Sequence, residues 1–184
     1  MSELKRCKWC NMKNPIYIKY HDEEWCVPHF DDAYLFEMLV LESFQAGLSW
    51  ECVLNKREAF REAFDNFDAH LISEYTEEKL VSLAENKAII RNKLKIRATK
   101  TNAKVFLSIC EEFGGFCSYL RGIVGEKTVY EVGKVSSPLS DALSKDLIKR
   151  GMKFVGTTIM YSYLQAIGAV YSHDADCFLH KESF

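Results

Sequence analysis

"RGMKFVGTTIMYSYLQAIG", residues 150–168, outlines the end of one helix, a tight turn and the start of a second helix. Gly151 breaks the first helix, which would cover 141–150. Gly156 stands directly before the second helix, which would span about 157–167. The pattern predicts a helix–hairpin–helix, and the rest of the fold can be worked out around it.

The turn of this hairpin could hold a phosphate. Gly156 allows a backbone conformation that points N–H groups outward. Thr157 and Thr158 open the next helix, whose free N–H donors and dipole favour an anion. Such contacts fix the position of DNA without reading its sequence. The alternative is an ordinary corner between two helices, in which glycine only turns the chain. Local positive charge would come from Lys145, Lys149, Arg150 and Lys153.

The other segments also favour helices, because no stretch alternates apolar and polar residues long enough to make a convincing strand. A long segment runs from about Asn86 to Gly114, and 124–138 is the one stretch that predicts an irregular loop. The sequence therefore predicts a single all-α domain over residues 1–184. Candidate helix caps are Asp31 or Asp32 (to about Gly47), Ser49 (through Phe60), Thr76 and Ser140. The solvated face of the long helix would carry Lys87, Arg91, Lys93, Lys95, Arg97, Lys100 and Lys104.

Composition narrows the class of protein. The 184 residues are 48% apolar, enough for a sizeable core, and 27% charged, which argues against disorder. No apolar run approaches the roughly 18 residues that span a bilayer, and the N-terminus lacks the apolar region of a signal peptide. We therefore expect a cytoplasmic protein without membrane contact. The net charge of −2 favours no partner, but a local basic patch can still bind nucleic acid.

A metal site is suggested by the two ends of the chain. His173 and Cys177 stand one helical turn apart, and the N-terminal stretch offers Cys7, Cys10 and His21. One Cys and one His from each end would complete the tetrahedral Cys2His2 set that binds structural zinc. Spacing alone leaves open which cysteine takes part, and a His–Cys pair four residues apart also occurs by chance.

Glu42 lies in a run that is otherwise fit for burial, within "LESFQAGLSW" (41–50). A buried carboxylate must be paired or hydrogen-bonded, or else its pKa rises. Next to aromatic faces it suits a flat base that carries donors or a positive charge. The alternative is a partly exposed helix residue beside core aromatics.

Together these segments resemble the DNA-3-methyladenine glycosylase I family of base excision repair. The resemblance rests on "YHDEEW", "LFEMLVLESFQAGLSW", "FDNFD", "IIRNKLKI", "SDALSKDLIKRGMKFVGTTIMYSYLQAIG" and the terminal H-x-x-x-C. These blocks cover most of residues 7–177 in family order. Two positions depart from the family pattern, since Cys26 and Ala88 stand where glycine is usual.

The resemblance implies a helix–hairpin–helix DNA glycosylase fold, with the hairpin at about 140–168 and a structural zinc joining 7–21 to 173–177. The implied zinc ligands are Cys7, His21, His173 and Cys177, and Cys10 falls outside the pattern. Glu42 would contact the edge of the flipped base, as the catalytic or selecting carboxylate, in a pocket formed by Trp9, Tyr17, Tyr20, Trp25 and Trp50. The Ala46-Gly47-Leu48 turn would plug the gap in the duplex, and Lys153, Gly156, Thr157 and Thr158 would contact DNA.

The implied activity is hydrolysis of the N-glycosidic bond of 3-methyladenine in alkylated double-stranded DNA, by a monomer. Related enzymes that also cut the strand place a lysine just inside the second helix of the hairpin, where this chain has Thr157, Thr158 and Ile159. We therefore expect release of the base and an intact abasic site. Three interpretations compete with this one: a zinc-containing DNA-binding module without catalysis, a glycosylase with a different or wider substrate range that could include 3-methylguanine, and a scaffold with a vestigial pocket.

Overall fold

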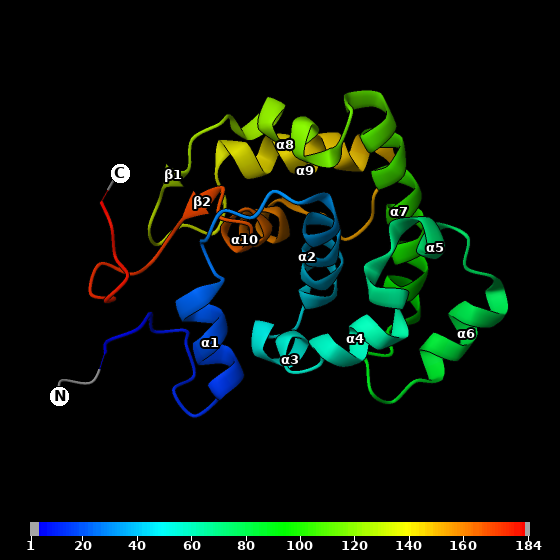
Figure 1. Cartoon of the computed structure of the whole chain (residues 1–184), viewed down its shortest axis with the longest axis horizontal. Helices are drawn as coiled ribbons and strands as arrows, with labels where there is room; N and C mark the ends of the chain where they lie inside the picture. The colour runs from blue at the N-terminus through cyan, green and yellow to red at the C-terminus, as the bar shows by residue number, and fades with distance from the viewer. Residues whose placement is uncertain (1–3, 183–184) are drawn as a thin grey trace.

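The computed structural model describes residues 4–182, which form a mostly helical structure with a two-stranded parallel sheet (Figure 1). The elements in chain order are α1 (Pro15–Glu23), α2 (Asp32–Gln45), α3 (Trp50–Leu54), α4 (Arg57–Ala63), the 3-10 helix η1 (Asp65–Phe67), α5 (Ala69–Ser73), α6 (Glu77–Glu85), α7 (Lys93–Phe113), α8 (Phe116–Val124), β1 (Val129–Tyr130), α9 (Pro138–Arg150), α10 (Thr157–Ala166) and β2 (Val170–Tyr171).

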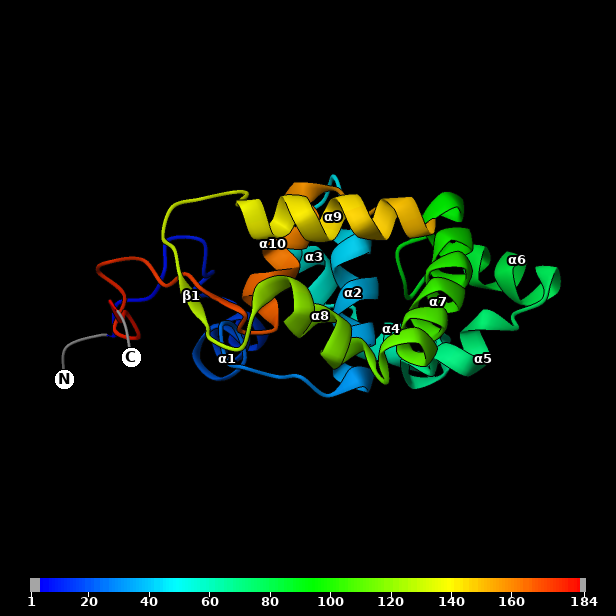
Figure 2. The same ribbon diagram turned by 90° about the horizontal axis from the view of Figure 1, so that it is seen from above.

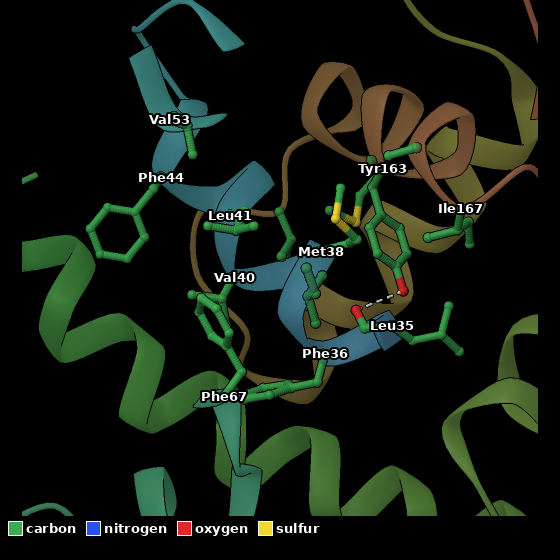
Figure 3. Close-up of a cluster of buried hydrophobic side chains, with 14 of the residues drawn as sticks. Leu35, Phe36, Met38, Val40, Leu41, Phe44, Val53, Phe67, Tyr163 and Ile167 are labelled. Atoms are coloured by element: carbon green, nitrogen blue, oxygen red, sulfur yellow. Dashed lines mark hydrogen bonds between the residues drawn. The ribbon is translucent and has the colours of Figure 1, made fainter. Parts of the chain in front are cut away.

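Helix α2 is the centre of the core because it is apolar on nearly every face. Its residues from Leu35 to Phe44, Glu37 excepted, are all buried. Figure 3 shows this helix surrounded by side chains of the neighbouring elements, and the Tyr163 hydroxyl of α10 donates a hydrogen bond to the Leu35 carbonyl at 3.2 Å. A helix buried on all sides carries Glu42 into the interior with it.

Several helix boundaries differ from the sequence predictions. Ser49 caps α3 as predicted, but α3 ends at Leu54 and Phe60 belongs to α4. The long helix begins at Lys93 rather than near Asn86, because the Asn92 side chain accepts hydrogen bonds from the first free N–H groups. Thr76 caps α6 as predicted, and α2 is capped by Asp31 and ends at Gln45.

The prediction that Ser140 caps the helix before the hairpin is wrong. That helix, α9, begins at Pro138, and the Ser140 hydroxyl instead accepts a hydrogen bond from the Ser137 N–H at 2.8 Å. The stretch 124–138 is not wholly irregular either. It contains β1, which pairs in parallel with β2 through Val129–Val170 and Tyr130–Tyr171.

The segments near the two chain ends lie side by side. Figures 1 and 2 show residues 4–14 beside the segment that follows β2, at the opposite end of the molecule from α6. The Phe178 N–H donates to the Lys5 carbonyl at 2.8 Å, which joins the two segments directly.

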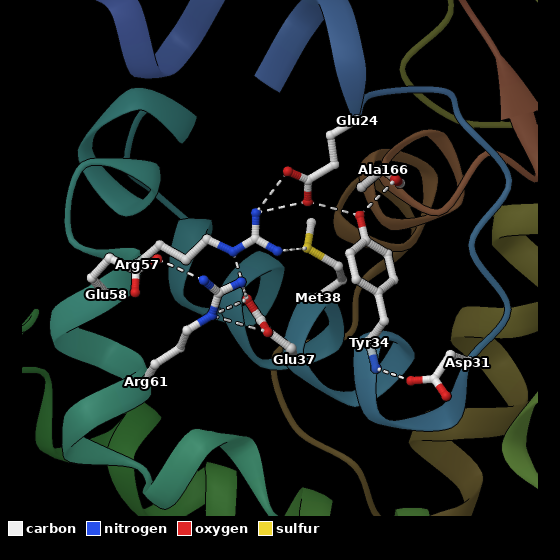
Figure 4. Close-up of polar contacts among 9 residues, drawn as sticks. All are labelled: Glu24, Asp31, Tyr34, Glu37, Met38, Arg57, Glu58, Arg61 and Ala166. Atoms are coloured by element: carbon white, nitrogen blue, oxygen red, sulfur yellow. Dashed lines mark hydrogen bonds and ion pairs between the residues drawn. The ribbon is translucent and has the colours of Figure 1, made fainter. Parts of the chain in front are cut away.

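Charged residues tie together α1, α2 and α4, of which α1 and α2 border the candidate site (Figure 4). The guanidinium of Arg57 on α4 donates to Glu24, the residue directly after α1, at 2.7 Å and to Glu37 of α2 at 2.5 Å. Arg61, one turn further along α4, pairs with Glu37 as well. This network fixes α1 against the central helix.

None of the helices among residues 4–182 combines the length and the apolar character needed to cross a membrane.

Candidate active site and metal centre

A cavity of about 350 Å³ lies between α1, α2, α3 and α10. It contains all six residues predicted for a base pocket, which are Trp9, Tyr17, Tyr20, Trp25, Glu42 and Trp50. The remaining lining residues are Gln45, Gly133, Lys134, Ser162, Gln165, Ser172 and Asp174, none of which was predicted from the sequence. Two pairs of lining residues follow helical spacing. Gln45 lies three residues after Glu42, and Gln165 lies three residues after Ser162, so the members of each pair share a helix face. That spacing could have identified Gln45, whereas nothing in the sequence marks Gly133 or Lys134.

Glu42 is the most unusual group in this cavity. Only 2% of the residue is exposed, and its Oε2 atom accepts no hydrogen bond within residues 4–182. Burial raises the pKa of this carboxyl well above its ordinary value. The Trp50 indole N–H and the Gln45 amide oxygen are also buried and unpartnered within the described chain. A cavity whose polar atoms lack partners is prepared for a ligand that supplies them.

Five of the thirteen residues that line the cavity are aromatic. The Tyr20 and Trp50 ring centroids lie 5.3 Å apart, and Trp9 contacts both Tyr17, at 5.2 Å, and Trp25, at 4.7 Å. Burial raises the pKa of Tyr17 to about 12, so its hydroxyl stays protonated and can donate a hydrogen bond at neutral pH. The wall therefore offers flat faces for a planar ring and hydroxyl groups at its edge.

The structure brings Cys7, His21, His173 and Cys177 together, with their candidate ligand atoms all within 4.8 Å of one another and all four side chains buried. Cys10 is also buried, but its sulfur lies 3.9 Å from the Tyr17 carbonyl oxygen and is not part of this cluster. Four ligands from the two ends of the chain could hold a metal ion.

The spacing of these atoms fits a tetrahedral zinc site. The Nδ1 atom of His173 lies 3.5 Å from both the Cys7 and Cys177 sulfurs, and the His21 Nε2 atom lies 3.6 Å from the Cys177 sulfur. Ligands at about 2.0 Å for nitrogen and 2.3 Å for sulfur around one zinc ion are separated by about 3.6 Å. These three nitrogen–sulfur distances therefore match those between neighbouring ligands of such a tetrahedron.

Neighbouring groups prepare the histidines as ligands. His21 Nδ1 lies 2.8 Å from Asp22, which also receives the Arg6 guanidinium, so the proton of His21 belongs on Nδ1. Its Nε2 atom, which faces the Cys7 N–H at 3.2 Å, then carries the lone pair that could bind a metal. Burial lowers the pKa of His173 to about 4, which keeps that ring neutral at physiological pH. Burial also raises the pKa of the Cys7 thiol, so a thiolate at this position requires a bound cation.

The metal cluster shares a wall with the cavity. The Trp25 ring lies 4.7 Å from the His173 ring in an edge-to-face contact, and the Trp9 ring lies 5.2 Å from that of His21. The two indoles therefore separate the four candidate ligands from the space beside Glu42. Closing the chain ends around a metal would also fix this side of the cavity.

The residues predicted to contact DNA lie in two turns. Gly47, with φ +79°, and the half-exposed Leu48 form the tip between α2 and α3. Thr157 and Thr158 open α10, where the Thr157 hydroxyl donates to Asp141 and lies 3.0 Å from the Ser140 hydroxyl. Gly156 precedes α10 with a φ of −62°, which any residue can adopt, so this backbone conformation does not require glycine. Instead, Gly151 (φ +105°) and Phe154 (φ +57°) turn the chain.

The two departures from the family pattern have different structural consequences. Cys26 has a φ of +64°, in the left-handed region where glycine is favoured, so the side chain is carried there at a steric cost. Ala88 is not among the residues of positive φ, and its methyl group needs no special backbone.

Comparison with known proteins identifies the family of this chain. The sequence profile of the methyladenine glycosylase family matches residues 9–180. The DNA-3-methyladenine glycosylase 1 of Escherichia coli (strain K12) is 42% identical over 181 residues, which are 95% of this chain and 96% of the relative. A crystal structure of 3-methyladenine DNA glycosylase I (TAG) shares 44% identity with a TM-score of 0.91, over 96% of this chain and 100% of that one. A second TAG structure, in complex with 3-methyladenine, has a TM-score of 0.89 at 31% identity, over 94% and 96% of the two chains.

The family match and the relatives thus show that this chain is a DNA glycosylase, an enzyme of DNA repair that hydrolyses N-glycosyl bonds. Within this class, the chain belongs to the methyladenine glycosylase family, and the relatives that it matches are DNA-3-methyladenine glycosylases.

Proposed function

We propose that this enzyme removes 3-methyladenine from alkylated double-stranded DNA and leaves an abasic site. The observation that carries the proposal is Glu42, a buried carboxyl without a partner for Oε2 in the described chain, enclosed by aromatic rings. Methylation at position 3 makes adenine cationic while it is still bonded to the sugar. A cation with N–H donors at its edge supplies what Glu42 lacks, and the faces of Tyr20 and Trp50 attract its charge.

The chemistry follows from the positive charge of the base. A glycosylase must take its target out of the stack before a pocket can hold it. Water then adds to the sugar carbon as the N-glycosidic bond breaks, and the bonding electron pair leaves with the base, which departs neutral. Such a leaving group needs no strong acid. Glu42 therefore acts chiefly by selecting the cation, and it can also accept the proton that the attacking water loses.

The two turns supply the DNA contacts in this proposal. The N–H groups at the start of α10, with Lys153 and Gly156 beside them, hold a backbone phosphate in the manner of a helix–hairpin–helix. Leu48, at the exposed tip after Gly47, fills the space that the flipped nucleotide leaves. No lysine opens α10, where Thr157, Thr158 and Ile159 stand, so base release leaves the strand uncut.

Zinc is the ion we propose for the Cys7, His21, His173 and Cys177 cluster, with a structural role. All four positions would be filled by protein ligands, which leaves no open site for water. Replacing Cys177 by serine should lower both metal content and thermal stability. The folded fraction should still bind 3-methyladenine, since no ligand belongs to the cavity wall; a metal content equal to that of the unchanged protein would contradict the assignment.

The decisive experiment uses duplex DNA methylated by an agent that forms both 3- and 7-methylpurines, with the released bases resolved by chromatography. We expect release of 3-methyladenine while 7-methylguanine stays in place. No release by a folded, zinc-containing preparation would refute the proposal and favour a protein that recognises lesions without excising them. A covalent complex with DNA trapped by borohydride would refute the claim that the strand is left uncut.

Glu42→Gln tests the role of the carboxyl. Glutamine keeps the size and one acceptor oxygen but cannot carry negative charge. If Glu42 chiefly selects the base, the variant should bind 3-methyladenine more weakly by a larger factor than it slows excision. Loss of turnover with base binding intact would assign Glu42 to the activation of water instead.

A further inference from the structure

One face of α7 reaches both turns that the proposed function assigns to DNA. Lys95, Thr99 and Asn102 follow one another at spacings of four and three residues, and all three are buried. This spacing places them on one side of the helix. Lys95 contacts the turn between α2 and α3, and Asn102 contacts the turn between α9 and α10.

Lys95 fixes the first turn. Its ammonium group donates to the Phe44 carbonyl at 2.7 Å and to the Ala46 carbonyl at 2.5 Å. The carbonyl between them, that of Gln45, accepts the Leu48 N–H at 2.6 Å. Three successive carbonyls at the end of α2, which a helix would otherwise leave without partners, are thus all bonded. The tip that carries Leu48 is therefore held in one conformation.

The location of Lys95 is costly for a cation. Only 5% of the residue is exposed, and burial lowers the pKa of its amine. It also lies in the first turn of α7, where the positive end of the helix dipole disfavours a positive side chain. The hydrogen bonds of the Lys95 amine to the turn between α2 and α3 offset this cost.

Asn102 fixes the second turn. Its side-chain amide donates to the Lys153 carbonyl at 2.9 Å and accepts the Lys153 N–H at 2.8 Å, so one side chain clamps both backbone groups of one residue. The Lys95 amine also lies 5.7 Å from the centre of the Phe154 ring, on the same turn. In Figure 1 the connection from α9 to α10 runs between α2 and α7, consistent with these contacts.

We propose that α7 is a spacer that sets the distance between the two DNA-contacting turns, with Lys95 and Asn102 as its positioning residues. Along a helix the two residues are about 10 Å apart. With both turns tied to this one rigid element, Leu48 enters the duplex at the same time as the start of α10 meets a phosphate. This inference rests on the proposed function, since it concerns the same two turns.

If α7 is such a spacer, a change on this face should affect excision from duplex DNA without affecting binding of the free base. No residue of the α7 face lines the cavity, so the pocket does not depend on it directly. A shift of about 1 Å in a positioning element can reduce a rate about 100-fold. Loss of the Lys95 contacts should therefore slow excision from duplex DNA while the free base still binds.

The test compares Lys95→Met with Lys100→Met. Lys100 is a matched control, because it lies on the same helix and its amine also donates to a backbone carbonyl, that of Tyr75, at 2.6 Å, away from both turns. Each variant is titrated with free 3-methyladenine by tryptophan fluorescence, which counts intact pockets. Single-turnover excision from methylated duplex DNA is then expressed per intact pocket. Lys95→Gln, which keeps a neutral donor, replaces Lys95→Met if that variant does not fold.

We expect excision per intact pocket to fall about 10- to 100-fold for the Lys95 variant and to change less than about 2-fold for Lys100→Met. In a Leu48→Ala background the Lys95 substitution should add little further loss, because the two changes disable the same tip. Equal excision by the two lysine variants, or fully multiplicative losses with Leu48→Ala, would overturn the spacer. Failure of the unchanged enzyme to excise would instead refute the proposed function.

Discussion

Replacing Arg57 by methionine should destabilise the protein, because this arginine is the shared partner of two carboxylates. Its side chain is 10% exposed, against 25% for Glu24 and 13% for Glu37. Removing one member of a buried ion pair costs about 3–5 kcal/mol, since it leaves a charge without compensation. Methionine preserves most of the length and apolar surface of the arginine stem, so the loss reports the charge and its hydrogen bonds.

The remaining contacts place the expected loss at the lower end of that range. Without Arg57, Glu37 keeps the Arg61 guanidinium at 2.8 Å, and Glu24 keeps the Tyr34 hydroxyl at 2.9 Å (Figure 4). We therefore expect about 3 kcal/mol. For a chain of this size that corresponds to a fall in Tm of about 6–12 °C.

The measurement is thermal unfolding followed by circular dichroism, with Arg61→Met as the matched control. Arg61 belongs to the same network but is 34% exposed, and one of its partners, Glu58, is 79% exposed. A pair so open to solvent contributes about 1 kcal/mol or less. Equal falls in Tm for the two variants would refute the argument that burial sets the strength of this network.

Three further predictions concern single positions. Gly168→Ala should lower the free energy of unfolding by more than about 3 kcal/mol, because the glycine has φ +74° and an added Cβ would lie 2.4 Å from the Pro28 nitrogen. The control Gly122→Ala, inside α8 with open space around it, should leave stability unchanged or raise it. Cys26→Gly should change stability by less than about 1 kcal/mol, because relief of the positive φ is offset by loss of a buried sulfur. Glu42→Gln should raise Tm at pH 8 and have little effect near pH 4. The folded-state pKa of this carboxyl is raised, so the native protein binds more protons than the unfolded chain does. The stability of the unchanged protein therefore falls as pH rises above the unfolded-state pKa of about 4.3, and the variant avoids this loss. Melting curves of each variant, over that pH range for Glu42, are the measurement, and a Glu42→Gln advantage that does not grow with pH would contradict the assigned burial effect.

The positions that local chemistry governs were predictable from the sequence. Asp31, Ser49 and Thr76 each cap the helix that follows, because a side-chain oxygen there satisfies free N–H groups whatever the rest of the fold does. The wrong prediction for Ser140 has the same origin, because Ser137 and not Ser140 is the N-cap of α9. Two serines three residues apart can exchange roles in a capping box, and only the position of Pro138 as the first helical residue decides between them.

Positions governed by tertiary contact could not be predicted in this way. Cys7 and Cys10 are both buried near the same chain end, so spacing could not choose between them; the choice depends on which sulfur faces the tail. Lys95 was predicted to lie on a solvated basic face. It is buried because α7 begins beneath the end of α2, a crossing between segments about fifty residues apart that no local pattern encodes.

The cavity depends both on local chemistry and on tertiary contact, and this explains why the sequence left two interpretations of Glu42. An acidic residue within an apolar helix fits an exposed position as well as a buried one, and α2 has no polar face that would decide. Once the helix is enclosed, only 2% of the residue is exposed, and the described chain supplies no partner for its Oε2 atom. The free enzyme therefore holds a group that is destabilised until a ligand with donors arrives. A neutral purine without a suitable donor leaves that cost in place, whereas a cationic base removes it, so the selectivity that we propose arises from the same burial that raises the pKa of Glu42.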